Sequence, residues 1–371
     1  MSFQFTHFLK ESHSSIDNQE KKCYAQLSNF SSNELLHSQL NDLTQRFFAD
    51  NVAEIARCYP YLLTARHEIA THYKITAEEI LLAPGSDFAI NLLLMAMKTQ
   101  QSIVLLDPEY YSYARYAKLN DFSIVRAKLD FLNFNHDFPA YDNQLNNLDP
   151  AIVVLSNPSG ITGLKLNLDE VKRIAECCYR NNHLLIIDEA YSAFEAIDHT
   201  AFLRNFDNII ILKSFSKSHG IAGLRFASVF TNKKIIDYLR KTGLENAVSG
   251  ISIAYFLFLL QNDDFIKKIH RDIMFSKKQF NKFINHVFPT WILFPTATHF
   301  ITIDTRNELL AQAIVGFLSS NKIAIKNLVN VCELKTCIRI TIAESQYMQP
   351  IMVLLQEFKD NQRQYFLDCN R

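Results

Sequence analysis

Short apolar runs alternate with amphipathic stretches along most of the chain. Five of these runs are nearly continuous in β-branched residues and leucine, and they lie at 103–107, 152–156, 184–188, 208–212 and 226–230. Runs that are apolar at successive positions are typical of strands buried on both faces, whereas a half-exposed strand alternates. The pattern therefore predicts a largely parallel or mixed sheet that is covered by helices on both sides.

Residues 167–182 predict one of the covering helices. Asn167 and Glu170 form an N-x-x-E start signal that resembles a capping box. Apolar residues then recur at 171, 174, 175 and 178, which places them along one face of a helix. A polar pair ends the helix directly before the run at 184–188, as expected of a crossover connection.

The pattern changes beyond residue 245, where Pro295 and apolar runs at 323–325 and 338–342 favour a smaller α+β unit. A chain of 371 residues is long for one simple domain. We therefore expect an α/β protein with three parts. Residues 1–45 form an N-terminal arm that is part of the small domain, residues 46–245 the large ligand-binding domain, and residues 246–371 the small C-terminal domain.

Composition limits the class of protein. Lys+Arg and Asp+Glu both number 38, so the chain lacks the basic surplus of a nucleic-acid binder. The longest apolar run, 251–260, is too short to span a bilayer, and the N-terminus has no signal-peptide core. The 7 cysteines are odd in number and lack metal-ligand spacing, which favours a reduced compartment. We expect a cytoplasmic protein without a metal, a membrane or a nucleic acid as partner.

Polar residues gather where the predicted strands end, the edge at which open α/β sheets bind ligands. After 80–82, the sequence Pro84-Gly85-Ser86-Asp87 opens an apolar helix, whose free N–H groups form an anion site, although Ser and Asp are also ordinary caps. After 103–107, Tyr110 and two further tyrosines can offer a flat aromatic surface or simply pack.

Two later strand ends add further polar groups. Residues 156–163 read SNPSGITG, a tight polar loop that an ordinary βα turn explains equally well. The run 184–188 ends in Asp188, followed by Glu189 and, two residues later, Tyr191. A buried carboxylate needs a cation or hydrogen-bond donors, so Asp188 requires either a protonated ligand nitrogen or an ordinary ion-pair partner.

The last strand end reads KSFSKSHGIAGLR over residues 213–225. The hydroxyls of Ser214 and Ser216 with the Arg225 guanidinium can hold a phosphate. Lys217 beside them becomes a nucleophilic amine if burial or a nearby cation lowers its pKa, whereas a surface loop is the alternative. Together the strand ends fit a flat ring with a phosphate, an aldehyde and a ring nitrogen, which is pyridoxal phosphate (PLP).

On the blocks 85–87, 188–191 and 214–225, the chain resembles class I/II, fold-type I, PLP-dependent aminotransferases, most closely their histidinol-phosphate aminotransferase-like branch. The similarity runs from about residue 27 to residue 345. It implies a fold-type I architecture, with a mostly parallel seven-stranded sheet between helices and a smaller α+β C-terminal domain. It also implies a homodimer that moves an amino group between an amino acid and a 2-oxo acid.

The resemblance implies roles for the matched residues. Lys217 corresponds to the Schiff-base lysine, Asp188 to the partner of the pyridine nitrogen and Tyr191 to a ligand of the ring hydroxyl. Arg339 corresponds to the residue that binds the substrate α-carboxylate, and Asn33 to an asparagine of the substrate pocket. The remaining implied cofactor ligands are Ser86, Asp87, Ser214, Ser216 and Arg225 at the phosphate, Tyr110 on the ring face, Asn157 near the ring hydroxyl, and Tyr59 across the dimer interface.

Three positions depart from the pattern of that branch. Gly160 stands where a loop asparagine contacts the cofactor ring hydroxyl, so Asn157, a water or Tyr191 alone has to serve there. Lys326 replaces an arginine of phosphate-substrate members and loses its bidentate fork. His299 replaces an asparagine before a small-domain strand.

Two alternatives to an aminotransferase remain open at this point. One fold can host several reactions, and a decarboxylase similar to threonine-phosphate decarboxylase needs the same cofactor-binding residues. A non-catalytic PLP-binding protein is the more remote alternative, since regulators of that kind carry a DNA-binding module for which the chain has no spare length.

Overall fold

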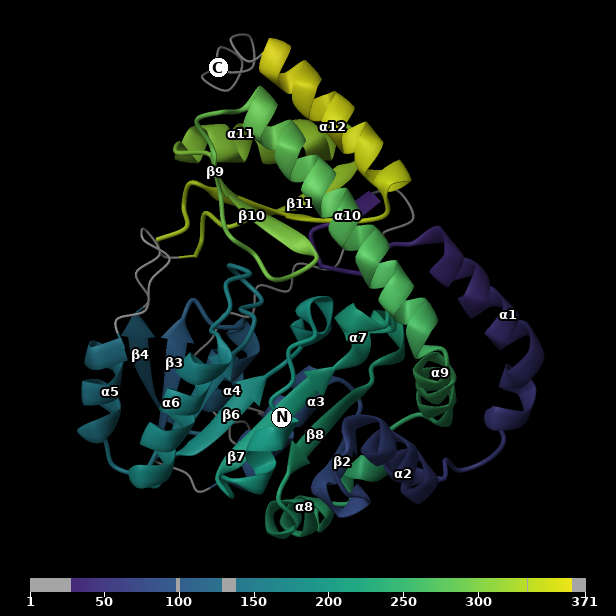
Figure 1. Ribbon diagram of the computed structural model, residues 1–371, viewed down its shortest axis with the longest axis vertical. Coiled ribbons are helices and arrows are strands. Elements are labelled where there is room, and N and C mark those ends of the chain that lie inside the picture. Colours follow the sequence, from purple (N-terminus) through teal and green to yellow (C-terminus); the bar gives the residue numbers. More distant parts are fainter. Residues whose placement is uncertain (1–27, 98–100, 129–137, 332, 362–371) are drawn as a thin grey trace, which may run out of the picture.

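Two β-sheets organise the computed structural model, which describes residues 28–97, 101–128, 138–331 and 333–361 (Figure 1). The larger sheet has 7 strands in the order β2-β8-β7-β6-β5-β3-β4. These strands are β2 (Ile80–Ala83), β3 (Ser102–Asp107), β4 (Ser123–Lys128), β5 (Ile152–Ser156), β6 (Leu184–Asp188), β7 (Ile209–Ser214) and β8 (Ala227–Thr231).

The large sheet is parallel except at β8. Strands β4, β3, β5, β6 and β7 pair in parallel, while β8 pairs antiparallel with both β7 and β2. The five strands predicted from apolar runs correspond to β3, β5, β6, β7 and β8 with ends shifted by at most two residues. Strand β7 is buried along its whole length, as expected for a strand covered on both faces.

Helices cover both faces of this sheet (Figure 1). They are α2 (Leu62–Tyr73), α3 (Ser86–Ala96), α4 (Tyr111–Leu119), α5 (Phe138–Asn146), α6 (Leu168–Arg180) and α8 (Lys233–Arg240), with the single turn α7 (Phe215–Ser218) after β7. The predicted capping box of α6 is confirmed. The Asn167 side chain accepts from the Glu170 amide at 3.0 Å, and the Glu170 side chain accepts from the Asn167 amide at 2.7 Å.

The smaller sheet has 5 strands in the order β1-β11-β12-β10-β9. They are β1 (Ser28–Phe30), β9 (Ile292–Leu293), β10 (Phe300–Asp304), β11 (Ile323–Asn327) and β12 (Cys337–Thr341). Strand β1 pairs in parallel with β11, so residues 28–30 share a sheet with the C-terminal third of the chain. Residues 1–27 of the predicted arm lie outside the described residues.

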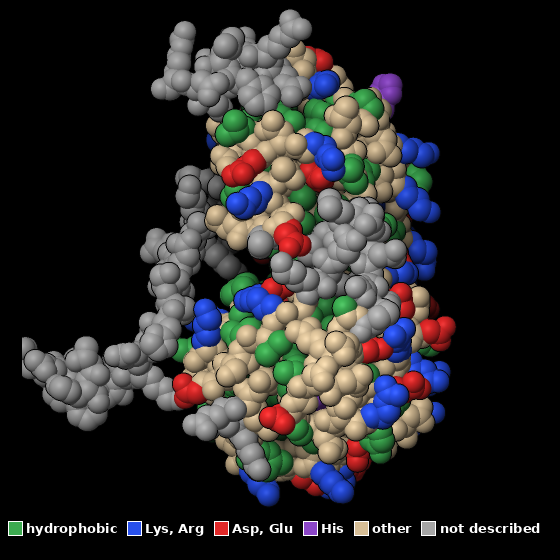
Figure 2. All heavy atoms as spheres, turned by 90° about the vertical axis from the view of Figure 1, so that its left-hand side faces the viewer, with side chains coloured by type: hydrophobic (Ala, Val, Ile, Leu, Met, Phe, Trp, Pro, Cys, Tyr) green, Lys and Arg blue, Asp and Glu red, His purple; other side chains and the backbone are tan. Residues whose placement is uncertain are grey.

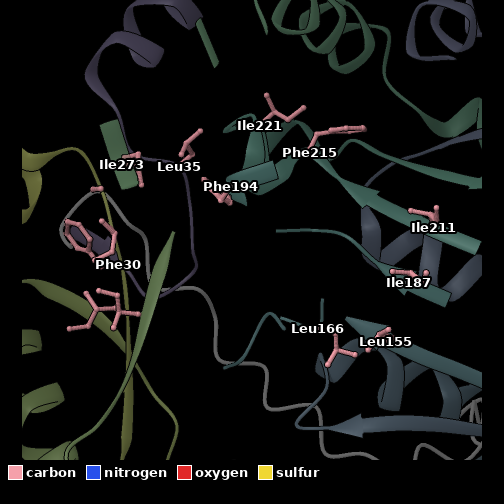
Figure 3. Packing of buried hydrophobic residues seen from close by; sticks show 14 of the residues in the cluster. Phe30, Leu35, Leu155, Leu166, Ile187, Phe194, Ile211, Phe215, Ile221 and Ile273 are labelled. Atoms are coloured by element: carbon pink, nitrogen blue, oxygen red, sulfur yellow. The ribbon is translucent and has the colours of Figure 1, made fainter. Parts of the chain in front are cut away.

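Long helices connect the two parts. Helix α1 (Ser38–Ile55) packs on α9 (Gly250–Gln261), and α10 (Asp263–Val287) runs from α9 towards the small sheet, where it packs on α12 (Ser345–Asp360) (Figure 1). Helix α11 (Glu308–Ser320) packs on β11. One apolar core joins the two parts and includes residues from both, among them Leu155, Ile187, Ile211, Phe194, Phe215, Phe30, Leu35 and Ile273 (Figure 3).

The surface carries both signs of charge. Lysines and arginines are interspersed with aspartates and glutamates on the face shown in Figure 2. Within the described ranges, no helix is both long enough and apolar enough to cross a membrane. Cys58, Cys177, Cys178 and Cys337 are free thiols.

Candidate active site

The predicted strand-end residues meet at the carboxyl edge of the large sheet. Asp188 is the last residue of β6, and Ser214 is the last residue of β7, its neighbour. Ser156 at the end of β5 pairs in register with Asp188 from the other side. Because parallel strands end at the same edge, residues far apart in the chain converge here.

Asp188 is a buried carboxylate with hydrogen-bond donors but no ion-pair partner in the described part of the chain. Its Oδ2 accepts from the Tyr113 hydroxyl at 2.9 Å, and its Oδ1 accepts from the Ala190 amide at 3.0 Å. Burial raises the pKa of Asp188 to about 6. A protonated nitrogen placed beside this group would favour its ionised form.

Glu189, the next residue, has its charge matched within the protein. Lys213 forms an ion pair with Glu189, and His199 Nδ1 lies 2.7 Å from Glu189 Oε1. Although burial opposes ionisation, Lys213 and His199 lower the pKa of Glu189 to about 2. Of the two adjacent acids, Asp188 is therefore the one left to pair with a ligand cation.

A cradle for an anion lies at the N-terminus of α3. Gly85 caps the helix with φ 90°, and a Cβ atom at this position would lie 2.6 Å from Arg225 Nη2. The missing side chain thus lets the Arg225 guanidinium approach the free amides of Ser86 and Asp87. The Ser216 hydroxyl is buried and has no hydrogen-bond partner among the described residues. These donors fit a phosphate group.

Lys217 lies on α7, directly after β7, and its Nζ donates to the main-chain oxygen of Ser32. Ser32 precedes Asn33, so the N-terminal segment passes beside the lysine. This places the amine between the edge of the large sheet and the segment that follows β1. A ligand held by the cradle and by Asp188 would lie next to it.

Tyr110 connects the α3 cradle to α4. Its hydroxyl donates to Asp87 Oδ1 at 3.0 Å, and Ser112 Oγ donates to the same oxygen at 2.6 Å. The Asp87 side chain is therefore bound to α4 and Arg225 Nη2 lies 3.7 Å from its other oxygen. The Asp87 amide lies in the first turn of α3, where the cradle needs it.

Tyr191 and Asn33 form a buried pair. The Asn33 side-chain amide donates to the Tyr191 hydroxyl at 2.9 Å, while Thr341 Oγ1 donates to Asn33 Oδ1 at 3.0 Å. Asn33 is only 1% exposed. The hydroxyl proton of Tyr191 can still be donated to a ring hydroxyl, and a direct contact between Asn33 and a substrate stays a prediction.

The structure of the loop after β5 accounts for the asparagine at 157 and the glycine at 160. The Asn157 side chain accepts from the Leu166 amide at 2.9 Å and donates to the Leu166 carbonyl at 3.2 Å, so its amide closes the loop. A Cβ atom at Gly160 would lie 3.0 Å from the Tyr191 ring. The Tyr191 ring thus borders the position at which the related enzymes carry an asparagine.

Arg339 on β12 is buried between the two parts. Its guanidinium donates to the carbonyls of Gly160 and Ser31 and lies 5.0 Å from the centre of the Phe300 ring. Lys326 is its register partner on β11. Burial, and next the charge of Arg339, lower the pKa of Lys326. Neither cation has a carboxylate partner among the described residues, so together they fit an anion.

Tyr59 lies outside this cluster. Its side chain is 96% exposed on the surface of the single chain, before α2. Its predicted role therefore depends on a second copy of the protein.

Two residues of the site were not assigned a role from the sequence. Tyr113 lies one helical turn after Tyr110 and donates to Asp188, and this spacing was the available signal. Glu109 is half-buried next to Tyr110 in the chain, accepts from the Ser156 amide and hydroxyl, and its pKa is raised to about 7 by desolvation. Nothing in the local pattern distinguishes Glu109 from an exposed acid.

The donor set fits pyridoxal phosphate. The anion cradle follows β2, the buried carboxylate of Asp188 ends β6, and the Lys217 amine follows β7. Strands β6 and β7 are neighbours in the sheet. These groups match the phosphate, the pyridine nitrogen and the aldehyde of that cofactor. Tyr191 offers a hydroxyl, and Tyr110 an aromatic ring, on the same side of the sheet.

Comparison with known proteins agrees with this fit. The profile of the family described as "Aminotransferase class I and II" matches residues 25–350. Histidinol-phosphate aminotransferase 2 of Legionella pneumophila (strain Lens) is 26% identical over 300 residues, 78% of each chain.

Two solved structures share the fold at 20% identity. Histidinol-phosphate aminotransferase of Sinorhizobium meliloti, in complex with pyridoxal-5'-phosphate, has a TM-score of 0.79 over 90% of this chain and 91% of that one. L-threonine-O-3-phosphate decarboxylase of Porphyromonas gingivalis has a TM-score of 0.75 over 90% of this chain and 100% of that one. The chain therefore belongs to the aminotransferase class I and II family, which confirms the predicted fold type, the PLP cofactor and the aminotransferase assignment.

Proposed function

We propose that this aminotransferase works as a cytoplasmic homodimer in which Lys217, Asp188 and Tyr191 carry the reaction. The observation that supports this most directly is the convergence of three groups on one sheet edge. Lys217 follows β7, Asp188 ends the adjacent β6, and the α3 cradle with Arg225 follows β2. Each group matches one part of the cofactor.

Pyridoxal phosphate, when bound, supplies an aldehyde that takes up the amino group and a ring that accepts electrons. Asp188 holds the ring nitrogen in its protonated form, which keeps the ring electron-poor. The Tyr113 hydroxyl and the Ala190 amide orient the carboxylate for this task, because they occupy one oxygen each. Tyr191 donates a hydrogen bond to the ring hydroxyl.

Lys217 has two tasks in this proposal. Its amine would hold the cofactor through the aldehyde that the cofactor supplies. With a donor bound, Nζ would take the proton from the donor's Cα atom and hold it for return, acting first as a base and then as an acid. Its position on a short turn after β7 keeps the amine on the side of the segment 31–33.

Arg339 and Lys326 bind the anionic groups of the substrates. Arg339 holds the carboxylate of the donor and of the 2-oxo acid acceptor, which orients the Cα–H bond towards Lys217. Lys326 adds a second cation on the neighbouring strand. This pair also fits a donor whose anionic group is a phosphate in place of a carboxylate, and the curated relatives are named for one such amine, histidinol phosphate.

Replacement of Lys217 tests the assignment. Borohydride reduction should fix the cofactor to the native protein at residue 217, and peptide mass spectrometry reports the position. Lys217→Ala should abolish both fixation and turnover. The proposal is wrong if the cofactor is fixed to another lysine in the native protein.

A donor screen tests the reaction itself. Amino acids and amino phosphates, histidinol phosphate included, are added singly to the yellow holoenzyme, and the loss of the visible band reports conversion of the aldehyde form. Carbon dioxide is measured in the same samples. Band loss without carbon dioxide, restored by a 2-oxo acid, is the expected result, whereas carbon dioxide release in place of amino transfer would establish the decarboxylase alternative. No response to any donor would favour the non-catalytic alternative.

A further inference from the structure

The rings of two buried histidines, His270 and His299, contact the ring of Phe194. The His299 ring stacks on Phe194 with centroids 4.2 Å apart and an interplanar angle of 18°, and the His270 ring lies at 4.8 Å and 47°. Phe194 follows Tyr191 by three residues, and it lies where segments of both parts meet (Figure 3). The three rings come from a turn after β6, from α10 and from the start of β10.

His270 contacts the main chain next to the reactive lysine. Its Nε2 lies 2.6 Å from the carbonyl oxygen of Ser218, the residue after Lys217. A carbonyl oxygen can only accept, so His270 carries its proton on Nε2. The Ser218 hydroxyl is also bound to His219 Nδ1 at 2.8 Å. Helix α10 thus holds the end of the turn that bears the lysine.

His299 contacts the main chain of the N-terminal segment in the same way. Its Nε2 lies 3.1 Å from the carbonyl oxygen of Asn33, again as the donor. Asn33 has a left-handed backbone with φ 55°, and its side chain donates to the Tyr191 hydroxyl at 2.9 Å. His299 therefore helps to hold the residue that orients Tyr191.

Both rings are held neutral by their surroundings. Burial lowers the pKa of His299 and of His270. The charges of Lys217 and Lys277 lower the pKa of His299 further, while the Ser218 carbonyl and Asp263 act in the opposite direction on the pKa of His270. A neutral ring with its proton on Nε2 is a fixed hydrogen-bond donor, as a residue that only holds the main chain in place requires.

We infer that His270 and His299, whose rings both pack against Phe194, are positioning residues that set the Lys217 amine and the Tyr191 hydroxyl relative to each other. The inference rests on the proposed roles of Lys217 and Tyr191. Neither histidine needs to touch the cofactor or the substrate, because each acts through one carbonyl oxygen. This gives His299 a function at a position where the related branch carries asparagine.

The test uses a pair of variants at each histidine. Glutamine places an amide donor near the position of Nε2, whereas leucine keeps bulk and removes the donor. His183→Leu is the matched control, because His183 is also fully buried. Its ring is hydrogen-bonded to main-chain groups, namely the Ala151 amide at 3.0 Å and the Leu145 carbonyl at 2.9 Å. It lies before the start of β6, at the end of that strand opposite to the site. The readouts are the pH midpoint of the visible cofactor band, kcat, KM and thermal stability.

His270→Leu and His299→Leu should shift the pH midpoint and lower kcat by roughly tenfold to a hundredfold with KM little changed, because a misplaced catalytic group slows proton transfer. The glutamine variants should restore most of the native pH midpoint and most of the native kcat. His183→Leu should lower thermal stability and leave the midpoint and kcat unchanged.

The inference fails if the leucine variants behave as His183→Leu does, or if glutamine gives no recovery at either position. Should one leucine variant not fold, its glutamine variant and the other pair decide the matter. A native protein that forms no visible band with pyridoxal phosphate would contradict the proposed function itself, so the two failures are distinguishable.

Discussion

At the scale of single residues, the adjacent acids Asp188 and Glu189 show how burial and partners divide chemical roles. Glu189 has Lys213 and His199 as partners, and it is ionised and structural. Asp188 has hydroxyl and amide donors alone, and its pKa is raised to about 6 by burial. Without a cation beside it, ionised Asp188 is a cost to the folded protein.

That cost predicts a pH-dependent effect of Asp188→Asn on the cofactor-free protein. An unfolded aspartate ionises near pH 3.9, whereas folded Asp188 ionises near 6. The native chain therefore loses stability relative to the variant as the pH rises from about 4 to above 6, by up to about 3 kcal/mol. Urea unfolding at pH 4 and at pH 8 measures most of the difference. Asp149→Asn, at an exposed position, is the control, and an advantage of Asp188→Asn that does not grow with pH would contradict the prediction.

Arg339 leads to a second prediction at this scale. Arg339→Ala should raise KM for both substrates by roughly tenfold to a hundredfold, since a hydrogen bond to a charged group is worth about 1.5–3 kcal/mol. Arg339→Lys should reverse part of the rise in KM, because lysine keeps the positive charge but cannot make the two parallel hydrogen bonds of a guanidinium. Steady-state kinetics measures this, with Arg306→Ala at an exposed arginine as the control. An unchanged KM would remove Arg339 from the substrate site.

At the scale of elements, the strand-to-helix junctions create the site. The α3 junction depends on Gly85, whose φ of 90° and close approach to Arg225 both exclude a side chain. The loop after β5 depends on Asn157, which binds the Leu166 main chain at both its amide and its carbonyl. These junctions bring main-chain amides and side chains to the sheet edge in a fixed arrangement.

Gly85→Ala should therefore weaken binding of pyridoxal phosphate at least tenfold. A methyl group 2.6 Å from Arg225 Nη2 has to displace the guanidinium, and the backbone at φ 90° and ψ 161°, a region that essentially only glycine adopts, adds strain of about 1–3 kcal/mol. Titration of the cofactor-free protein with pyridoxal phosphate, followed by absorbance, gives the affinity. Gly316→Ala in α11, where nothing lies within 4 Å, should leave it unchanged. Equal affinities for the two variants would mean that Arg225 does not bind the phosphate.

At the scale of the whole molecule, the small sheet completes the site. Strand β1 joins β11, so the segment 31–33 that follows it reaches Lys217, Tyr191 and Arg339 from the side of the small sheet. Arg339 itself bonds to Gly160 on the loop after β5. The proposed homodimer would add Tyr59, which is exposed in the single chain.

Mixed dimers test the contribution of Tyr59. If the Tyr59 side chain serves the partner's site, Tyr59→Ala and Lys217→Ala chains combined should form dimers in which one of the two sites is intact. Activity should then rise above that of either variant alone. Tyr61→Ala, at a neighbouring exposed tyrosine, should not reduce the activity by itself. Light scattering that shows an active monomer would contradict the proposal.

Much of the large sheet could be predicted from the sequence, because strands buried on both faces leave continuous apolar runs. The helix α6 was equally accessible, since its capping box and apolar stripe lie within 12 consecutive residues, 167–178. The chemistry of 214–225 was also local. The roles of Tyr113, Glu109 and His270 were not, because each depends on a partner distant in sequence.

The residue pattern was thus sufficient for the class of fold and the family, since these depend on periodicity and on short motifs, and it also supplied the residues proposed to hold the cofactor. Three-dimensional contacts were needed to learn which acid lacks a cation, which asparagine closes a loop and which histidine contacts the turn that bears Lys217. Hydrogen bonds such as that between His299 and Asn33 join residues 266 positions apart. Burial and pairing at such distances arise from packing, and no local pattern carries them.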